Sequence, residues 1–219
     1  MRKVTVFLAF WVFCTLTALS QGSRPGWTEY RINGGEVVLS LPNSMKVFES
    51  KKKGFSAVKN ADGSYSVRNR EEILFVPLAD STDYDKEEDM NLNNMVVVMV
   101  DEDEDGLGKA IKLMKNNRIV RSVAGWGLKM AVGLEQERSK DDKLKVTNTT
   151  PVILKKIAGR DAISMGMGFK DKNGRSADGK VYLIENKGKG IVLAFLNEKG
   201  RTGFTKKDHE EVLSSLRLK

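Results

Sequence analysis

The residues with the clearest chemical pattern are the acidic run from Asp101 to Asp105 and the Gly106 that follows it. Its Asp-x-Asp-x-Asp-Gly spacing matches the first half of an EF-hand calcium loop. In that loop, carboxylates at alternate positions converge on one ion and the glycine allows a sharp turn. Asp101, Asp103 and Asp105 are therefore the candidate metal ligands. The second half of the pattern is absent, because position twelve is Lys112 where a bidentate glutamate belongs.

The same acidic run has a second interpretation, because it lies between an apolar strand and a helix that begins at Leu107. Carboxylates ahead of a helix accept hydrogen bonds from its free N–H groups and favour its positive end. Asp103 to Asp105 would then cap the helix. The calcium interpretation needs a further ligand from the acidic loop 83–89 and implies the millimolar affinity typical of extracellular sites.

Other residues offer little catalytic chemistry. His209 is the single histidine, and it lies three and four residues before the apolar Val212 and Leu213, so we expect a packed structural side chain. The single cysteine, Cys14, lies in the N-terminal segment, which leaves the rest of the chain without a disulfide, a thiolate metal site or a thiol nucleophile. No nucleophile elbow, Walker loop or dinucleotide motif is present. We therefore predict no catalytic residue and no cofactor other than calcium, and a hydrolase using two carboxylates is the weaker alternative.

Residues 1–20 have the pattern of a secretory signal. Arg2 and Lys3 precede an uncharged run from Val4 to Leu19, and small residues end it before Gln21. The alternative is a retained anchor, but the 16 residues of the run are fewer than the roughly 20 that span a bilayer. We expect an exported protein, periplasmic or secreted, with no stable membrane span after cleavage.

Charge is distributed unevenly. The chain has a formal net charge of +8, yet the segment from Asp80 to Asp105 contains eleven acidic residues and one basic residue, Lys86. The basic remainder could attract anionic partners, although lysine spread over loops and helix faces also keeps a domain soluble. Nucleic-acid binding would need basic residues interleaved with aromatic ones, and export argues against it. The predicted partner is another envelope or extracellular protein.

Apolar periodicity divides the chain into a short polar lead, 21–34, and a single α+β domain, 35–219. Short strands come first, then a helical segment, several antiparallel strands and a terminal helix capped by Thr205 and Asp208. We expect an antiparallel sheet covered by helices. The predicted strands are 36–42, 45–48, 73–78, 95–100, 144–149, 152–157, 162–169 and the hairpin pair 180–185 and 191–196.

Two motifs carry a family resemblance. The opening Gly-Glu-Val-Val-Leu-Ser-Leu-Pro at 35–42 and the hairpin feeding a helix that ends Leu-Ser-Ser-Leu-Arg-Leu at 213–218 resemble the Mog1/PsbP-like fold. The resemblance implies an α-β-α sandwich without a catalytic constellation, in a group that includes a small-GTPase-binding protein, a photosystem accessory subunit and exported bacterial proteins. No functional residue of the group maps onto this chain. The resulting hypothesis is an exported, non-enzymatic accessory or binding protein, with a calcium-responsive module using Asp101–Asp105 as the alternative.

Overall fold

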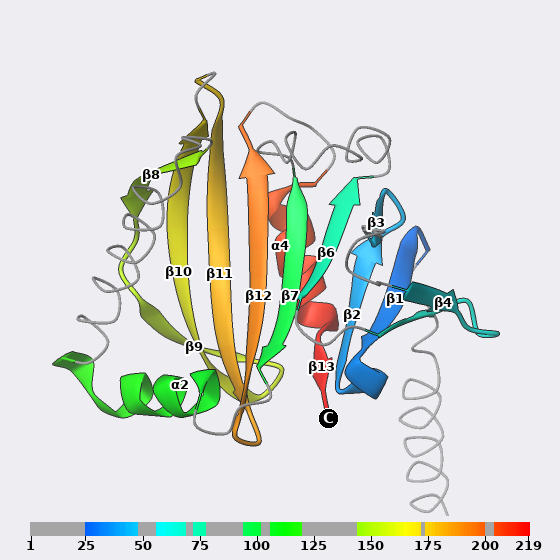
Figure 1. Ribbon diagram of the computed structural model, residues 1–219, viewed down its shortest axis with the longest axis horizontal. Helices are drawn as coiled ribbons and strands as arrows, with labels where there is room; N and C mark the ends of the chain where they lie inside the picture. Colours follow the sequence, from blue (N-terminus) through cyan, green and yellow to red (C-terminus); the bar gives the residue numbers. More distant parts are fainter. Residues whose placement is uncertain are drawn as a thin grey trace, which may run out of the picture.

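The computed structural model describes residues 25–47, 56–68, 72–77, 94–101, 106–119, 144–171, 174–199 and 204–219. The predicted signal segment 1–20, the candidate ligands Asp103 and Asp105, and the apolar stretch 123–134 lie outside these ranges. The described residues form two β-sheets and two α-helices (Figure 1).

The smaller sheet has five strands in the order β13-β2-β1-β5-β4. Its neighbours are antiparallel except β1 and β5, which are parallel. A 3-10 helix, η1 (Asn33–Gly35), joins β1 to β2. The strands are β1 (Trp27–Ile32), β2 (Val37–Pro42), β4 (Ser56–Lys59), β5 (Tyr65–Arg68) and β13 (Arg217–Leu218).

The larger sheet has eight strands, all paired antiparallel, in the order β3-β6-β7-β12-β11-β10-β8, and β9 pairs with β10 beside β8. The strands are β3 (Met45–Val47), β6 (Glu72–Pro77), β7 (Met95–Asp101), β8 (Leu144–Thr149), β9 (Ile153–Ile157), β10 (Arg160–Asp171), β11 (Ser176–Asn186) and β12 (Lys189–Glu198).

The hairpin of β11 and β12 confirms the predicted one and forms the centre of the larger sheet. The pairing runs from Ala177 opposite Glu198 to Asn186 opposite Lys189. The two turn residues, Lys187 and Gly188, both have positive φ, at 54° and 93°. Two-residue turns of this kind match the right-handed twist of the flanking strands.

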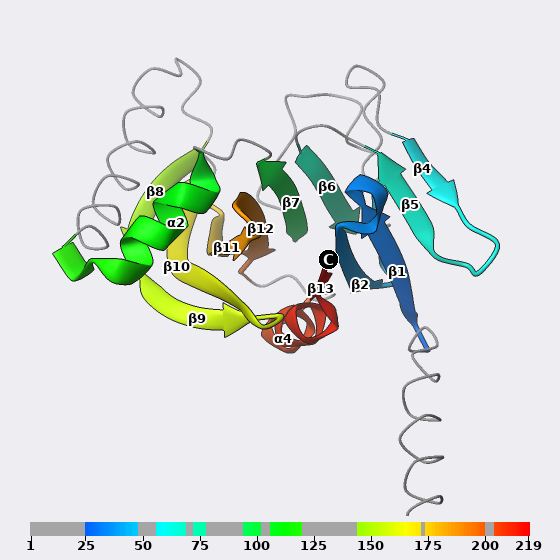
Figure 2. The same ribbon diagram turned by 90° about the horizontal axis from the view of Figure 1, so that it is seen from below.

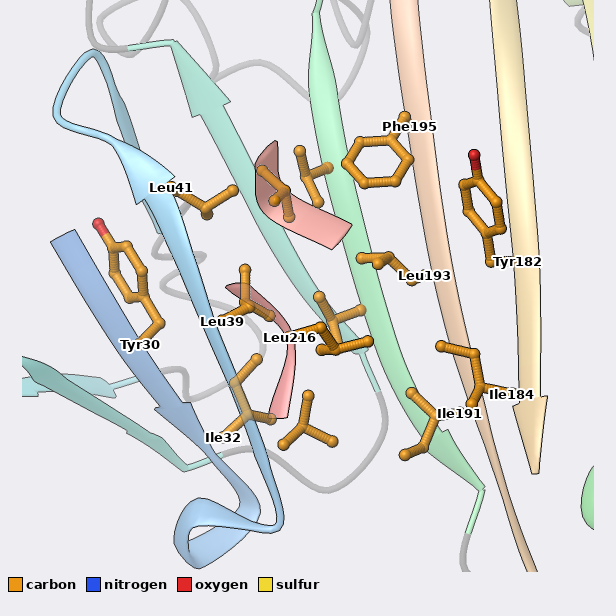
Figure 3. Close-up of a cluster of buried hydrophobic side chains, with 14 of the residues drawn as sticks. Tyr30, Ile32, Leu39, Leu41, Tyr182, Ile184, Ile191, Leu193, Phe195 and Leu216 are labelled. Carbon is orange, nitrogen blue, oxygen red and sulfur yellow. The ribbon is translucent and has the colours of Figure 1, made fainter. Parts of the chain in front are cut away.

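The hydrophobic core lies between the two sheets (Figure 3). β2 contributes Leu39 and Leu41, and β12 contributes Leu193 and Phe195, all of them at most 1% exposed. The residues that lie between them in sequence, Ser40 on β2 and Ala194 on β12, point to the other face and are only partly buried, as the alternation of side chains along a strand predicts.

The two helices described pack on opposite faces of the larger sheet. α2 (Leu107–Asn116) places Ile111 and Met114 against Ile163 on the face away from the core. α4 (Lys206–Ser215) places Val212 in the core, and Figure 2 shows this helix between the two sheets, next to β2. The predicted start of α4 is confirmed, because Thr205 and Asp208 form a reciprocal capping box.

The α+β class is confirmed, with three differences from the sequence-based expectations. A second sheet, rather than helices alone, covers the core face of the larger sheet. β1 forms inside the predicted polar lead 21–34, because Tyr30 and Ile32 alternate with polar residues and are buried. The uniformly apolar run 95–100 predicts a central strand buried on both faces, and β7 is central, but it is buried on one face only, since Met99 is 39% exposed.

Within the described ranges, no helix has the length and apolar character needed to cross a bilayer.

Candidate functional site

Asp101, the first candidate ligand of the acidic run, ends β7 and lies opposite Gly190 of β12. Its Oδ2 accepts a hydrogen bond of 2.7 Å from the backbone N–H of Leu107, the first residue of α2. One of the free N–H groups of the helix is thereby satisfied, and a carboxylate stands near the positive end of the helix. The helix-cap interpretation therefore holds for Asp101, two residues before the run 103–105 to which the sequence assigned it.

The residues around Asp101 hold the start of α2 against the larger sheet. Glu185 of β11 and Asp101 of β7 lie on either side of Gly190 in the same row of the sheet. Glu185 Oε1 accepts a hydrogen bond of 2.8 Å from Gly188 N–H and lies 3.4 Å from Nζ of Lys112 in α2. The Asp101 carboxylate is thus bonded to the first residue of α2, and the Glu185 carboxylate interacts with both α2 and the β11–β12 turn.

Glycines let the helix approach the sheet closely. A Cβ atom built on Gly190 would lie 2.9 Å from Cδ2 of Leu107. A Cβ atom built on Gly108 would lie 2.7 Å from the carbonyl carbon of Gly188 and 2.8 Å from that of Lys189. Distances below 3.0 Å are essentially never found for real Cβ atoms. The start of α2 therefore rests directly on the backbone of the β11–β12 turn.

The structure describes the candidate calcium ligands only in part. No three His, Cys, Asp or Glu side chains are grouped as metal ligands among the residues that the structure describes. Asp103 and Asp105 lie outside those residues, so only Asp101 of the three candidate ligands can be placed. With one oxygen of Asp101 bonded to α2, a bound ion would share this carboxylate with the helix.

His209 of α4 is a packed structural side chain, as the sequence predicts. Its ring stacks on Phe195 with centroids 4.3 Å apart and lies 4.9 Å from the ring of Phe204. Nε2 is buried and has no hydrogen-bond partner. Burial lowers the pKa of His209 to about 4, although the neighbouring Asp208 carboxylate acts in the opposite direction. The ring is therefore neutral near pH 7, and it helps to hold α4 on the sheet.

Gly108 and Glu185 also position α2 and are not among the residues that the sequence singled out. A glycine near the start of a helix is unfavourable by helix propensity, and that was the one signal available. Glu185 gave no signal, because its role depends on a strand pairing that brings it into the row of Asp101.

Comparisons with known proteins define the fold. The solution structure of cyanobacterial PsbP (CyanoP) from Synechocystis sp. PCC 6803 shares 13% sequence identity, covers 91% of this chain and 96% of its own, and gives a TM-score of 0.50. A crystal structure from Bacteroides thetaiotaomicron VPI-5482 shares 13% identity over 88% of this chain at a TM-score of 0.47. This chain spans 48% of that protein's length. No protein-family model and no curated protein matches the sequence. The chain has a PsbP/Mog1-like α+β fold.

Proposed function

We propose that this chain is an exported, non-enzymatic accessory protein of the cell envelope that binds another protein. The observation that supports this most strongly is the structural use of Asp101 and His209. Asp101 holds the start of α2 through Leu107, and the ring of His209 in α4 packs against the rings of Phe195 and Phe204. A general base or metal ligand needs a lone pair directed at a substrate or ion, and the buried Nε2 of His209 does not reach solvent.

The fold and the N-terminal segment are compatible with this proposal. α2 and α4 lie on opposite faces of the larger sheet, which supports the α-β-α arrangement that the family resemblance implies. The signal-like segment 1–20 supports export, and an exported chain with few aromatic residues is better suited to a protein partner than to nucleic acid.

Site-specific photocrosslinking in the cells that produce the protein tests the proposal. A photoreactive residue is placed at one of three exposed apolar positions on different surfaces: Val58 on β4, Leu113 on α2 and Ile153 on β9, which are 58%, 56% and 47% exposed. A protein that docks on one surface gives a discrete crosslinked species from one or two positions and none from the others. Detection uses an antibody raised against the protein.

Two results would contradict the proposal. One is the absence of a discrete adduct at all three positions while the protein is present and folded. The other concerns export: the envelope fraction should contain a chain that begins at Gln21, as its intact mass would show. A full-length chain found in the cytosol would rule out the envelope role.

A further inference from the structure

β9 is an edge strand of the larger sheet with exposed apolar side chains on both of its faces. β8 and β9 follow one another along the same side of β10 (Figure 1), and among the described strands β9 pairs with β10 alone. Ile153 and Leu154 are both exposed, and they lie on opposite faces because neighbouring side chains alternate along a strand. Of the large apolar side chains that are exposed in the described part of the chain, these two are the only ones adjacent in sequence.

The extended conformation of β9 is fixed at both ends. Ahead of the strand, Thr150 donates its N–H to the carbonyl oxygen of Gly166 at 2.9 Å, and its Oγ1 accepts a hydrogen bond of 2.7 Å from the N–H of Gly166. At the other end, Ile157 is buried in the core and leads into the two-residue turn Ala158–Gly159, where φ is 48° and 74°. A segment that pairs with β9 does not have to order it first, which lowers the entropic cost of binding.

The turn also determines which backbone groups of β9 point away from the sheet. Ile157 pairs with Arg160 across the two-residue turn, and the residues that flank such a turn exchange their backbone hydrogen bonds. Bonded and non-bonded pairs alternate along an antiparallel ladder. The N–H and C=O groups of Leu154 and Lys156 therefore point outward, and no other strand in the described ranges pairs with them.

The other edges of the two sheets are less suited to an additional strand. β13 has two residues and β3 has three. β8 exposes the polar side chains of Lys145, Thr147 and Asn148. β4 has four residues and a single exposed large apolar side chain, Val58. Of the described edge strands, β9 offers the best combination of length and apolar surface.

Two lysines of β9 select the charge of the strand that can pair with it. Lys156 Nζ lies 2.5 Å from Oδ1 of Asp161. Lys155, on the opposite face, has no carboxylate partner in the described part of the chain, and its Nζ lies 5.8 Å from the ring centroid of Tyr182. Two copies paired through β9 would bring four lysines onto two neighbouring strands, which is unfavourable. An incoming strand with a carboxylate opposite Lys155 would form an ion pair instead.

We propose that β9 is the site where the partner protein binds, through an extended acidic segment that joins the larger sheet as an additional strand. This inference rests on the proposed function, because it specifies where and how a protein partner docks. The outward backbone groups of Leu154 and Lys156 supply the hydrogen bonds of the new ladder. Apolar side chains of the segment cover Ile153 and Leu154, and a carboxylate lies opposite Lys155. In this mode of recognition the backbone provides affinity and the side chains provide specificity.

Photocrosslinking from position 153 in the producing cells, combined with two substitutions of Leu154, tests the backbone pairing. Leu154→Ala and Leu154→Pro both remove the leucine side chain, but only proline also removes the outward N–H. The pairing with β10 does not use this N–H, so proline is tolerated there, and circular dichroism will show that both variants fold. The yield of the adduct should be about ten-fold lower in Leu154→Pro than in Leu154→Ala, which corresponds to the loss of one backbone hydrogen bond.

Lys155→Glu tests the charge and does not depend on the proline variant. It places a carboxylate opposite that of the partner and should lower the yield from position 153 by roughly ten-fold or more. Lys59→Glu on β4 makes the same change of charge on the other sheet and should leave the yield unchanged. Mass spectrometry of the adduct should find Asp or Glu within about two residues of the attachment point, because directly opposite and diagonal side chains are in reach across a strand pair.

The outcomes separate a failure of this proposal from a failure of the proposed function. An adduct from Val58 or Leu113 but none from Ile153 keeps the protein partner and overturns β9 as its site. Equal yields from folded Leu154→Pro and Leu154→Ala overturn the addition of a strand. An adduct with twice the mass of the chain identifies a second copy and overturns the acidic partner. The absence of any adduct from all three positions refutes the proposed function and this inference together.

Discussion

Gly108→Ala is the substitution for which the close packing of α2 gives a result opposite to helix propensity. On propensity alone, alanine in place of glycine inside a helix stabilises it by about 1 kcal/mol. At Gly108, however, the added methyl group would lie 2.7 Å from the carbonyl carbon of Gly188 and 2.8 Å from that of Lys189. Both neighbours are backbone atoms of a tight turn, so neither can rotate away, and the helix itself must move.

The size of the effect follows from what that movement disturbs. An ordinary contact begins near 3.4 Å, so the start of α2 must move outward by about 1 Å. Ile111 and Met114, which are 1% and 5% exposed, would then separate from Ile163. A gap of 0.5–1 Å loses roughly a quarter to a half of the dispersion energy at a contact, and overpacking costs about 1–3 kcal/mol. We expect Gly108→Ala to lower the free energy of unfolding by about 2 kcal/mol after the gain in propensity.

Urea denaturation followed by circular dichroism measures the change in the free energy of unfolding. In thermal unfolding, the melting temperature should fall by roughly 4–8 °C. Leu113→Ala on the exposed side of the same helix is the control, and it should change the free energy of unfolding by no more than about 0.5 kcal/mol. If Gly108→Ala is neutral or stabilising, α2 does not rest on the Gly188 backbone, and the account of its docking is wrong.

Three further predictions concern the other helix end, the histidine and the ion. Thr205→Ala removes the capping box of α4 and should cost about 1 kcal/mol, whereas Lys207→Ala should have little effect; equal losses in urea denaturation would argue against the cap. Because His209 has a pKa of about 4 in the folded protein and about 6.5 when unfolded, the unfolded state binds more protons between these values. Stability should therefore fall as the pH is lowered from 6.5 to 4, by at most about 1.4 kcal/mol per pH unit. His209→Phe should flatten this part of the pH profile, and an unchanged slope would show that other groups cause it. If Asp101 serves only as the cap of α2, calcium at millimolar concentration should raise the melting temperature no more than magnesium does; a rise specific to calcium and abolished by Asp103→Asn would establish the calcium site.

Local patterns predicted much of the fold. The β11–β12 hairpin and the cap of α4 at Thr205 were recognisable because they depend on residues close together in sequence. β1 was not recognised, since only Tyr30 and Ile32 of its six residues are buried. The two-residue strand β13 exists through its pairing with β2 near the other end of the chain. Long-range pairings of this kind leave no local periodicity.

The candidate site was predictable to a smaller extent. The acidic run indicated Asp101 as a candidate residue. The role of Asp101, however, depends on its position at the end of β7 opposite Gly190, where its carboxylate accepts the N–H of Leu107 at the start of α2.

The most direct test of the central claim, that this chain binds a protein rather than catalyses a reaction, is photocrosslinking repeated in the double variant Asp101→Asn, His209→Phe. Asparagine keeps an acceptor for the Leu107 N–H and phenylalanine keeps an aromatic ring beside Phe195, so the variant should fold, as circular dichroism will show. The account predicts the same discrete adduct, from the same surface position, as in the unaltered protein. Loss of the adduct from a folded double variant would mean that Asp101 or His209 serves the function itself and would contradict the account.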